Sequence, residues 1–210
     1  MTGATENEST PARPAARRSR AGSGRERILD AAAQLFAAQG YAGTSTRDIA
    51  QQAGIRQPSL YAHFTLKSEI LCELLVETLR PPVAYAAKLF DDADLPARER
   101  LVRLLDFDIR GLFAGRRTVA LLGVRPEVRS PEFDEAHQLR NRLRDLYGRL
   151  CGEVLAEAGN PVTPDELRRT TAIVFSLVES INSRRYDDPE LDMELTILDT
   201  TTAILRILGA

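Results

Sequence analysis

The spacing of apolar side chains is the feature of this sequence that most restricts its fold. Large apolar residues recur every three or four positions through most of the chain, a spacing that places them on one face of an α-helix. The first such series is Ile28, Leu29, Ala32, Leu35 and Phe36. No segment has the sustained alternation of apolar and polar residues that is typical of a strand. The sequence therefore predicts an all-α protein of about nine helices, with no internal repeat.

Turn-forming residues divide this pattern into separate helices. The first helix begins near Arg25 and stops at Gly40, which favours a helix end. Pro81-Pro82 lacks backbone donors and disfavours helix at the preceding residue, so we place a domain boundary there. The remaining helices are predicted at 46–53, 57–64, 67–79, 83–90, 96–114, 117–124, 132–158, 164–185 and 190–208. These limits give an N-terminal domain at 23–80 and a larger domain at 81–210.

Positive charge is concentrated in the first part of the chain. The formal net charge is -2, but residues 1–80 carry ten Lys and Arg against eight Asp and Glu. Residues 81–210 carry eighteen basic and twenty-two acidic side chains, which makes them a poor partner for phosphate. Residues 1–22 contain almost no large apolar side chain and are expected to form a flexible basic arm. Such an arm is either solvated or reaches a phosphate backbone or minor groove.

Several classes of protein find no support in the sequence. Cys72 and Cys151 have no CxxC spacing, and two His residues do not suggest a zinc site, so we expect no metal and no disulfide. No segment resembles a signal peptide or a membrane helix, which favours the cytoplasm. The motifs GxSxG and HExxH and the phosphate-binding P-loop are absent, so we expect no cofactor and no enzyme.

Residues 45–64 are predicted to form two short helices around a glycine turn. Ser45 and Asp48 have the spacing of a capping box, in which each side chain satisfies a free amide at the helix start. Gly54 permits the positive φ that ends this helix, and Pro58 suits the first turn of the next one. Both features are typical of a helix-turn-helix.

The second of these helices has an outer face without carboxylates. Gln57, Ser59, Tyr61 and His63 offer amide, hydroxyl, phenol and imidazole groups, which match the donors and acceptors of the DNA major groove. Lys67 begins the next helix, where its charge and the helix dipole both favour a phosphate. We expect this surface to contact double-stranded DNA.

From Arg25 to Leu71 the chain resembles TetR-type regulators, named after the tetracycline repressor. The matching residues are Ile28-Leu29-Asp30-Ala31-Ala32, Leu35-Phe36, Gly40-Tyr41, Asp48-Ile49-Ala50, Ala53-Gly54-Ile55, Leu60-Tyr61, His63-Phe64, Lys67 and Leu71. The resemblance implies an N-terminal helix-turn-helix domain and a C-terminal domain that dimerises and binds a small molecule.

Individual contacts to DNA also follow from the resemblance. It implies phosphate contacts for Thr46, Ser59, His63 and Lys67. It implies contacts to base edges or a thymine methyl for Arg47, Gln57, Pro58 and Tyr61. Arg56 departs from the family pattern, in which a small capping residue such as Ser is common, and would instead add a cation near the DNA backbone.

The two C-terminal helices are apolar around most of their circumference and must be covered on more than one side. Paired with their copies across a two-fold axis, they would form a four-helix bundle, so we expect a homodimer. Weaker candidates for a ligand cavity in the same domain are Phe107, Arg110, Leu121, Leu122, Tyr147, Phe175, Glu179 and Asn182. For Glu179 the competing interpretation is an ion pair with an Arg of the second subunit or a place at an exposed edge of the bundle.

Together these features favour a transcriptional repressor that a small-molecule effector releases from a palindromic operator. The alternatives are a helical protein-interaction adaptor, which would leave the carboxylate-free face unused, and a small all-α enzyme.

Overall fold

A computed structural model of the chain describes residues 23–92, 94–114 and 130–210. Over these ranges it contains eight α-helices, one 3-10 helix and no strand, which confirms the all-α prediction. The elements are α1 (Gly24–Gly43), α2 (Thr46–Gln52), α3 (Gln57–Tyr61), α4 (Lys67–Asp91), α5 (Ala97–Ala114), η2 (Pro131–Phe133), α7 (Asp134–Glu157), α8 (Pro164–Asp187) and α9 (Met193–Leu208). The arm predicted at 1–22 and the helix predicted at 117–124 lie outside the described residues.

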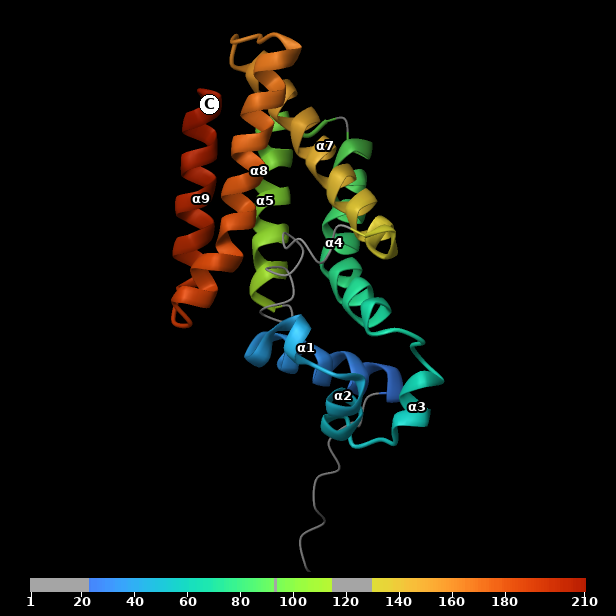
Figure 1. The fold of residues 1–210 in the computed structure, drawn as a ribbon. Coiled ribbons are helices and arrows are strands. Elements are labelled where there is room, and N and C mark those ends of the chain that lie inside the picture. Colours follow the sequence, from blue (N-terminus) through green and yellow to red (C-terminus); the bar gives the residue numbers. More distant parts are fainter. Residues whose placement is uncertain (1–22, 93, 115–129) are drawn as a thin grey trace, which may run out of the picture.

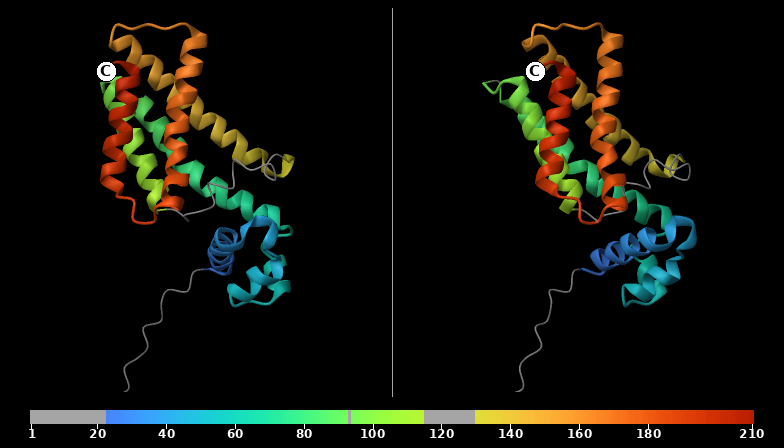
Figure 2. Two further views of the ribbon diagram at one scale, coloured as in Figure 1. Left: turned by 60° about the vertical axis from the view of Figure 1, so that its left-hand side comes forward. Right: turned by 90° about the vertical axis from the view of Figure 1, so that its left-hand side faces the viewer.

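The helices form two groups joined by α4. Helices α1, α2 and α3 lie together at one end of the molecule, with the first turns of α4 (Figure 1). Helices α5 and α7 pack against the rest of α4, and α8 and α9 pack in turn against α5 and α7. Helices α8 and α9 run side by side along one edge of this group (Figure 2).

Local capping explains where the first helices begin and end. The Ser23 hydroxyl and the Glu26 carboxylate form a capping box at the start of α1. Gly40, with φ of 77°, interrupts α1 at the predicted stop, and a short turn continues to Gly43. Ser45 and Asp48 form the predicted capping box of α2.

The predicted end of a helix before Pro81-Pro82 is wrong. Helix α4 continues through both prolines for 25 residues, so the segments predicted at 67–79 and 83–90 are one helix. Each proline removes one helical hydrogen bond. The helix persists because buried side chains follow one another on both sides of the diproline, from Ser68 to Leu89, where α4 packs against α5 and α7. Burial in the tertiary structure thus outweighs a local helix-breaking signal. The domain boundary at 80/81 stays a prediction.

Two hydrophobic cores correspond to the two groups of helices. The first core gathers α1, α2, α3 and the start of α4, and the second gathers the remaining helices. Helix α7 and the preceding η2 reach both cores: Phe133 and Ala136 are buried in the first, and Leu143 in the second. The two groups are therefore joined by contacts of α7 as well as by α4.

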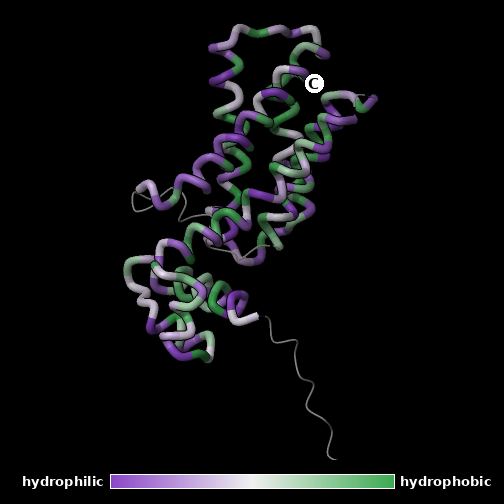
Figure 3. Tube along the Cα trace, turned by 90° about the vertical axis from the view of Figure 1, so that its right-hand side faces the viewer, coloured by the Kyte–Doolittle hydropathy of each residue, from purple (hydrophilic) through white to green (hydrophobic). Residues whose placement is uncertain are grey.

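Hydrophobic and hydrophilic residues are interspersed along the helices (Figure 3). Among the described helices, none is long and apolar enough to cross a membrane. Each helix instead turns one face to a core.

Candidate functional site

The turn between α2 and α3 has the geometry of a helix-turn-helix. Gly54 adopts φ of 65°, a conformation that residues other than glycine rarely take, and its amide donates to the carbonyl of Gln51 at 3.1 Å. Ile49, Ala50 and Leu60 are almost fully buried beneath the two helices. These contacts fix the angle at which α3 leaves α2.

Two arginines of α1 hold this unit in place. The Arg27 guanidinium donates to the carbonyl of Ala53 at 3.4 Å, at the end of α2. Arg25 forms an ion pair with Glu73 at 3.1 Å and lies over the Phe64 ring, 5.0 Å from its centroid. These contacts were not predicted from the sequence, because the partners are 26 or more residues away and no local pattern marks them.

Most of the predicted DNA-contacting side chains lie at the surface. Arg47, Pro58, Ser59, Tyr61 and His63 are exposed, with Tyr61 47% accessible. The His63 imidazole lies against the start of α1, where a Cβ added at Gly24 would be 3.0 Å from its Nε2.

Thr46, Gln57 and Tyr61 form a hydrogen-bonded group that we call the recognition cluster. The hydroxyls of Thr46 and Tyr61 are 3.1 Å apart, and the Gln57 amide donates to each of them at 3.4 Å. These bonds link α2 to α3 across the turn. The cluster therefore presents donors and acceptors in a defined arrangement before any partner binds.

The carboxylates close to this surface in sequence are occupied at helix starts. Between Ser45 and Ile70 the chain has two, Asp48 and Glu69. Asp48 accepts from the hydroxyl and amide of Ser45, and these hydrogen bonds hold the pKa of Asp48 below its ordinary value. Glu69 accepts from the amides of Thr65 and Leu66. Both acidic groups stabilise local structure.

Lys67 has partners inside the molecule. Its ammonium donates to the carbonyls of Tyr41 and Thr44, both at 2.7 Å, and lies 4.2 Å from the centroid of the Tyr41 ring. Burial lowers the pKa of Lys67 from its ordinary value. Two of its three donor hydrogens thus hold the start of α4 against the end of α1. Its contact with phosphate stays a prediction, as do the other DNA contacts.

Arg56 occupies the N-cap position of α3 and makes no side-chain capping bond. Its side chain is exposed. The departure from the family pattern therefore leaves this helix start without a side-chain cap and adds a cation beside the recognition cluster.

A cavity of about 240 Å³ lies between α4, α5, α7 and α8. Three of the predicted ligand residues, Phe175, Glu179 and Asn182, line it. The described residues that line it are Leu75, Thr78, Leu79, Asp108, Leu112, Arg140, Leu143, Phe175, Val178, Glu179, Ser180, Asn182 and Ser183.

Other predicted ligand residues lie elsewhere. Phe107 faces a neighbouring hollow beside the diproline. Tyr147 is fully buried and does not line the cavity, because its hydroxyl donates to Asp108 at 2.8 Å. Leu121 and Leu122 lie outside the described residues.

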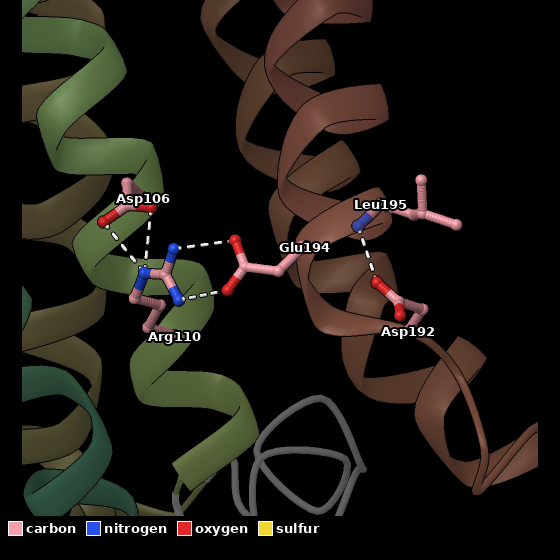
Figure 4. Close-up of polar contacts among 5 residues, drawn as sticks. All are labelled: Asp106, Arg110, Asp192, Glu194 and Leu195. Carbon is pink, nitrogen blue, oxygen red and sulfur yellow. Dashed lines mark hydrogen bonds and ion pairs between the residues drawn. The ribbon is translucent and has the colours of Figure 1, made fainter.

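Arg110 is likewise absent from the cavity lining, because its guanidinium reaches outward from α5 to α9. It forms paired hydrogen bonds of 2.6 and 2.9 Å with Glu194, and its Nε donates to Asp106 at 2.9 Å (Figure 4). In the same view Asp192 accepts from the amide of Leu195 and caps α9. The Arg110 contacts join two helices.

The cavity contains two charged residues that were not predicted from the sequence, Asp108 and Arg140. Arg140 donates to both carboxylate oxygens of Glu179, each at 2.6 Å, and lies 5.2 Å from the centroid of the Phe175 ring. Glu179 thus pairs with an Arg of its own chain. Asp108 is 5% exposed, and burial raises its pKa to about 6 against the opposing effect of the Tyr147 hydrogen bond. Perturbed buried carboxyls of this kind gather at functional sites.

Comparison with known proteins identifies the family. Residues 28–74 match the family described as bacterial regulatory proteins, tetR family. The transcriptional repressor KstR2 of Mycolicibacterium smegmatis is 37% identical over 87 residues, which cover 41% of this chain and 39% of that protein. KstR2 of Rhodococcus jostii is 31% identical over 125 residues, covering 59% of this chain and 61% of that protein. The chain therefore matches less than two thirds of the length of these curated relatives.

A solved structure extends the likeness to nearly the whole chain. Mycobacterium smegmatis AmtR is 38% identical, with a TM-score of 0.81 over 96% of this chain and 90% of that one. The helix-turn-helix, the all-α fold and these relatives agree, and the chain belongs to the TetR family of bacterial regulatory proteins.

Proposed function

We propose that this protein is a sequence-specific DNA-binding repressor that a small-molecule ligand releases from its operator. The observation that carries the proposal is the recognition cluster, a partly exposed polar group on α2 and α3 whose neighbouring carboxylates cap helix starts. Helix α3 itself carries no carboxylate, and its polar side chains offer groups that match base edges. The regulators among the relatives support this function over an enzyme or an adaptor.

Different side chains are assigned to different parts of DNA. Arg47, Gln57, Pro58 and Tyr61 would meet base edges or a thymine methyl. Thr46, Ser59, His63 and Lys67 would meet phosphates. The assignment predicts that substitutions in the first group change which sequence is bound, and that those in the second change affinity for all sequences.

A homodimer would place two such surfaces on one operator. Ile173 on α8 and Leu195 and Leu198 on α9 are 54%, 59% and 59% exposed. Exposed apolar side chains on two adjacent helices suit burial against a second copy of the chain. We propose that α8 and α9 pair with their copies across a two-fold axis, which makes the operator an inverted repeat.

Light scattering tests the dimer. A mass of about twice 23.2 kDa is expected across micromolar concentrations, and Leu198→Asp should bring it down to that of one chain. A mass of one chain for the unaltered protein would rule out the dimer.

Release would follow from the position of the cavity. Its walls include α4 and α7. The first turns of α4 pack with α1, α2 and α3 in the first hydrophobic core, and we call this group the DNA-binding unit. Phe133, which directly precedes α7, and Ala136 of α7 are buried in the same core. A ligand that moves either helix would change the separation of two recognition helices. The ligand must prefer the DNA-incompetent arrangement, and a hundredfold preference corresponds to roughly 2.7 kcal/mol.

Electrophoretic mobility shift with genomic fragments tests the DNA-binding function. The unaltered protein should retard a discrete fragment in competition with excess unrelated DNA. Gln57→Ala should weaken that preference, while Gln138→Ala, a substitution on α7 away from the recognition cluster, should leave it intact. Equal retardation of every fragment by the unaltered protein would contradict sequence-specific binding.

A further inference from the structure

The cavity between α4, α5, α7 and α8 carries an unbalanced set of charges. Its lining includes two carboxyl groups, Asp108 and Glu179, and one guanidinium, Arg140. Arg140 donates two short hydrogen bonds to Glu179, so these two opposite charges are paired. Among the described lining residues, the remaining charge is therefore that of Asp108.

Asp108 is placed to accept one more hydrogen bond. Its Oδ2 receives the Tyr147 hydroxyl at 2.8 Å, whereas its Oδ1 accepts none from the described residues. None of the arginines or lysines in the described part of the chain forms an ion pair with it. The charge of Glu179, which is of the same sign, also raises the pKa of Asp108. A buried carboxylate in this setting is stabilised by a cation that donates hydrogen bonds.

The rest of the lining suits an apolar body. Leu75, Leu79, Leu112, Leu143 and Val178 form most of the wall, and the Phe175 ring adds an aromatic surface. The volume of about 240 Å³ suits a compact molecule.

We infer that the effector of this cavity is a compact amphipathic amine, whose ammonium donates to Asp108 Oδ1 while its apolar part fills the space lined by leucines. The inference rests on the proposed ligand-release function and adds the chemical class of the ligand. An anionic effector would have to displace Glu179 from Arg140 and would meet the charge of Asp108. A neutral effector would leave the Asp108 carboxylate without a counter-charge.

Three probes with one apolar body and different head groups test the charge preference. Binding of 4-phenylbutylamine, 4-phenylbutanol and 4-phenylbutyrate to the full-length protein is measured by calorimetry at pH 7.5. The amine should bind at least about tenfold more tightly than the other two, as expected for a charge-assisted hydrogen bond to a buried carboxylate. Tighter binding of the carboxylate or alcohol, or binding of none of the three, would overturn the inference.

Variants assign the preference to Asp108. Asp108→Asn keeps an acceptor for Tyr147 and should abolish the advantage of the amine. Asp106→Asn is the matched control, because Asp106 lies on the same helix, pairs with Arg110 and does not line the cavity. An amine preference that survives in Asp108→Asn would contradict the assignment.

A second variant tests the charge balance of the cavity without a substitution at position 108. Glu179→Gln releases Arg140 from its carboxylate and should strengthen binding of 4-phenylbutyrate about tenfold or more, with no such change for the alcohol. Unchanged binding of the carboxylate would contradict the pairing on which the charge balance depends.

Operator binding by the same preparation separates this inference from the proposed function. A protein that retards a specific fragment but does not prefer the amine retains its DNA-binding function and loses the proposed ligand class. A protein that prefers the amine but binds no specific DNA retains the ligand class and loses the repressor function.

Discussion

The local structure of α2 and α3 and the cavity depend on contacts of different range, although contacts across 26 or more positions join α1 to these helices. At the start of α2, Ser45 and Asp48 are three positions apart, and the bond between Gln57 and Tyr61 spans four. In the cavity, Asp108 with Tyr147 and Arg140 with Glu179 are each 39 positions apart. A surface formed by residues close together in the chain can be predicted from the sequence. A cavity formed by four helices depends on how those helices pack.

The two regions also place their polar groups differently. The recognition cluster is largely at the surface, where water already solvates it. Asp108 is buried, and its raised pKa means that the folded protein disfavours its charge. The first region is thus suited to a large charged partner, and the second to a small one that brings a counter-charge.

Phe133→Ala tests whether the segment before α7 supports the DNA-binding unit. Of the substitutions considered, it has the largest expected effect on the free energy of unfolding. Phe133 precedes α7, yet it is 1% exposed within the core of the DNA-binding unit. Removing a buried aromatic ring should lower the free energy of unfolding by about 3 to 5 kcal/mol in urea denaturation. Gln138→Ala on the adjoining helix is the control. A decrease under about 1 kcal/mol would mean that α7 does not support the first region.

Asp108→Asn should stabilise the protein in a pH-dependent way. The pKa of Asp108 is raised from 3.8 to about 6, so the folded state binds this proton more tightly than the unfolded state. The contribution of Asp108 to the free energy of unfolding is therefore favourable below pH 3.8 and is lost as pH rises through 6.

The gain from Asp108→Asn over the unaltered protein should accordingly grow between about pH 4 and 6 and reach up to about 3 kcal/mol above that range. Urea denaturation at pH 4.5 and 7.5 measures this difference, with Asp106→Asn as control. Equal gains at the two pH values would contradict the burial of an ionised carboxyl.

Arg47→Ala should affect the first region alone. Its exposed side chain is assigned to base edges, so its removal should relax selectivity at particular positions by about 1 to 3 kcal/mol and leave folding stability within about 0.5 kcal/mol. Competition binding with single-base variants of the operator measures the effect. A uniform decrease across all variants would reassign Arg47 to the backbone.

Lys67→Ala distinguishes a phosphate contact from a purely internal role and has the smallest expected signal. If the third donor of the ammonium reaches a phosphate, the slope of log affinity against log salt should become shallower by roughly 1 for each half-site in which that phosphate is no longer neutralised. Removal of the bonds to Tyr41 and Thr44 alone would weaken binding without changing that slope. An unchanged slope would therefore contradict the predicted phosphate contact.

The helical class, the capping box at Ser45 and the turn at Gly54 could be predicted from the sequence, because each depends on residues within a few positions. The sequence misled at Pro81-Pro82, where packing of α4 on two helices overrides a local signal. Burial of Asp108 could have been predicted, since it follows Leu101, Leu104 and Leu105 at the spacing of a buried face. Its pairing with Tyr147 has no local signal in the sequence.

The central claim is that two copies of the recognition cluster specify a palindromic operator. Repeated selection of duplexes that bind the full-length protein from random-sequence DNA, followed by sequencing, tests it directly. The account predicts an enriched inverted repeat, with base preferences that weaken in both halves together for Gln57→Ala. Enrichment of no motif, or of a single half-site without its inverted copy, would contradict it.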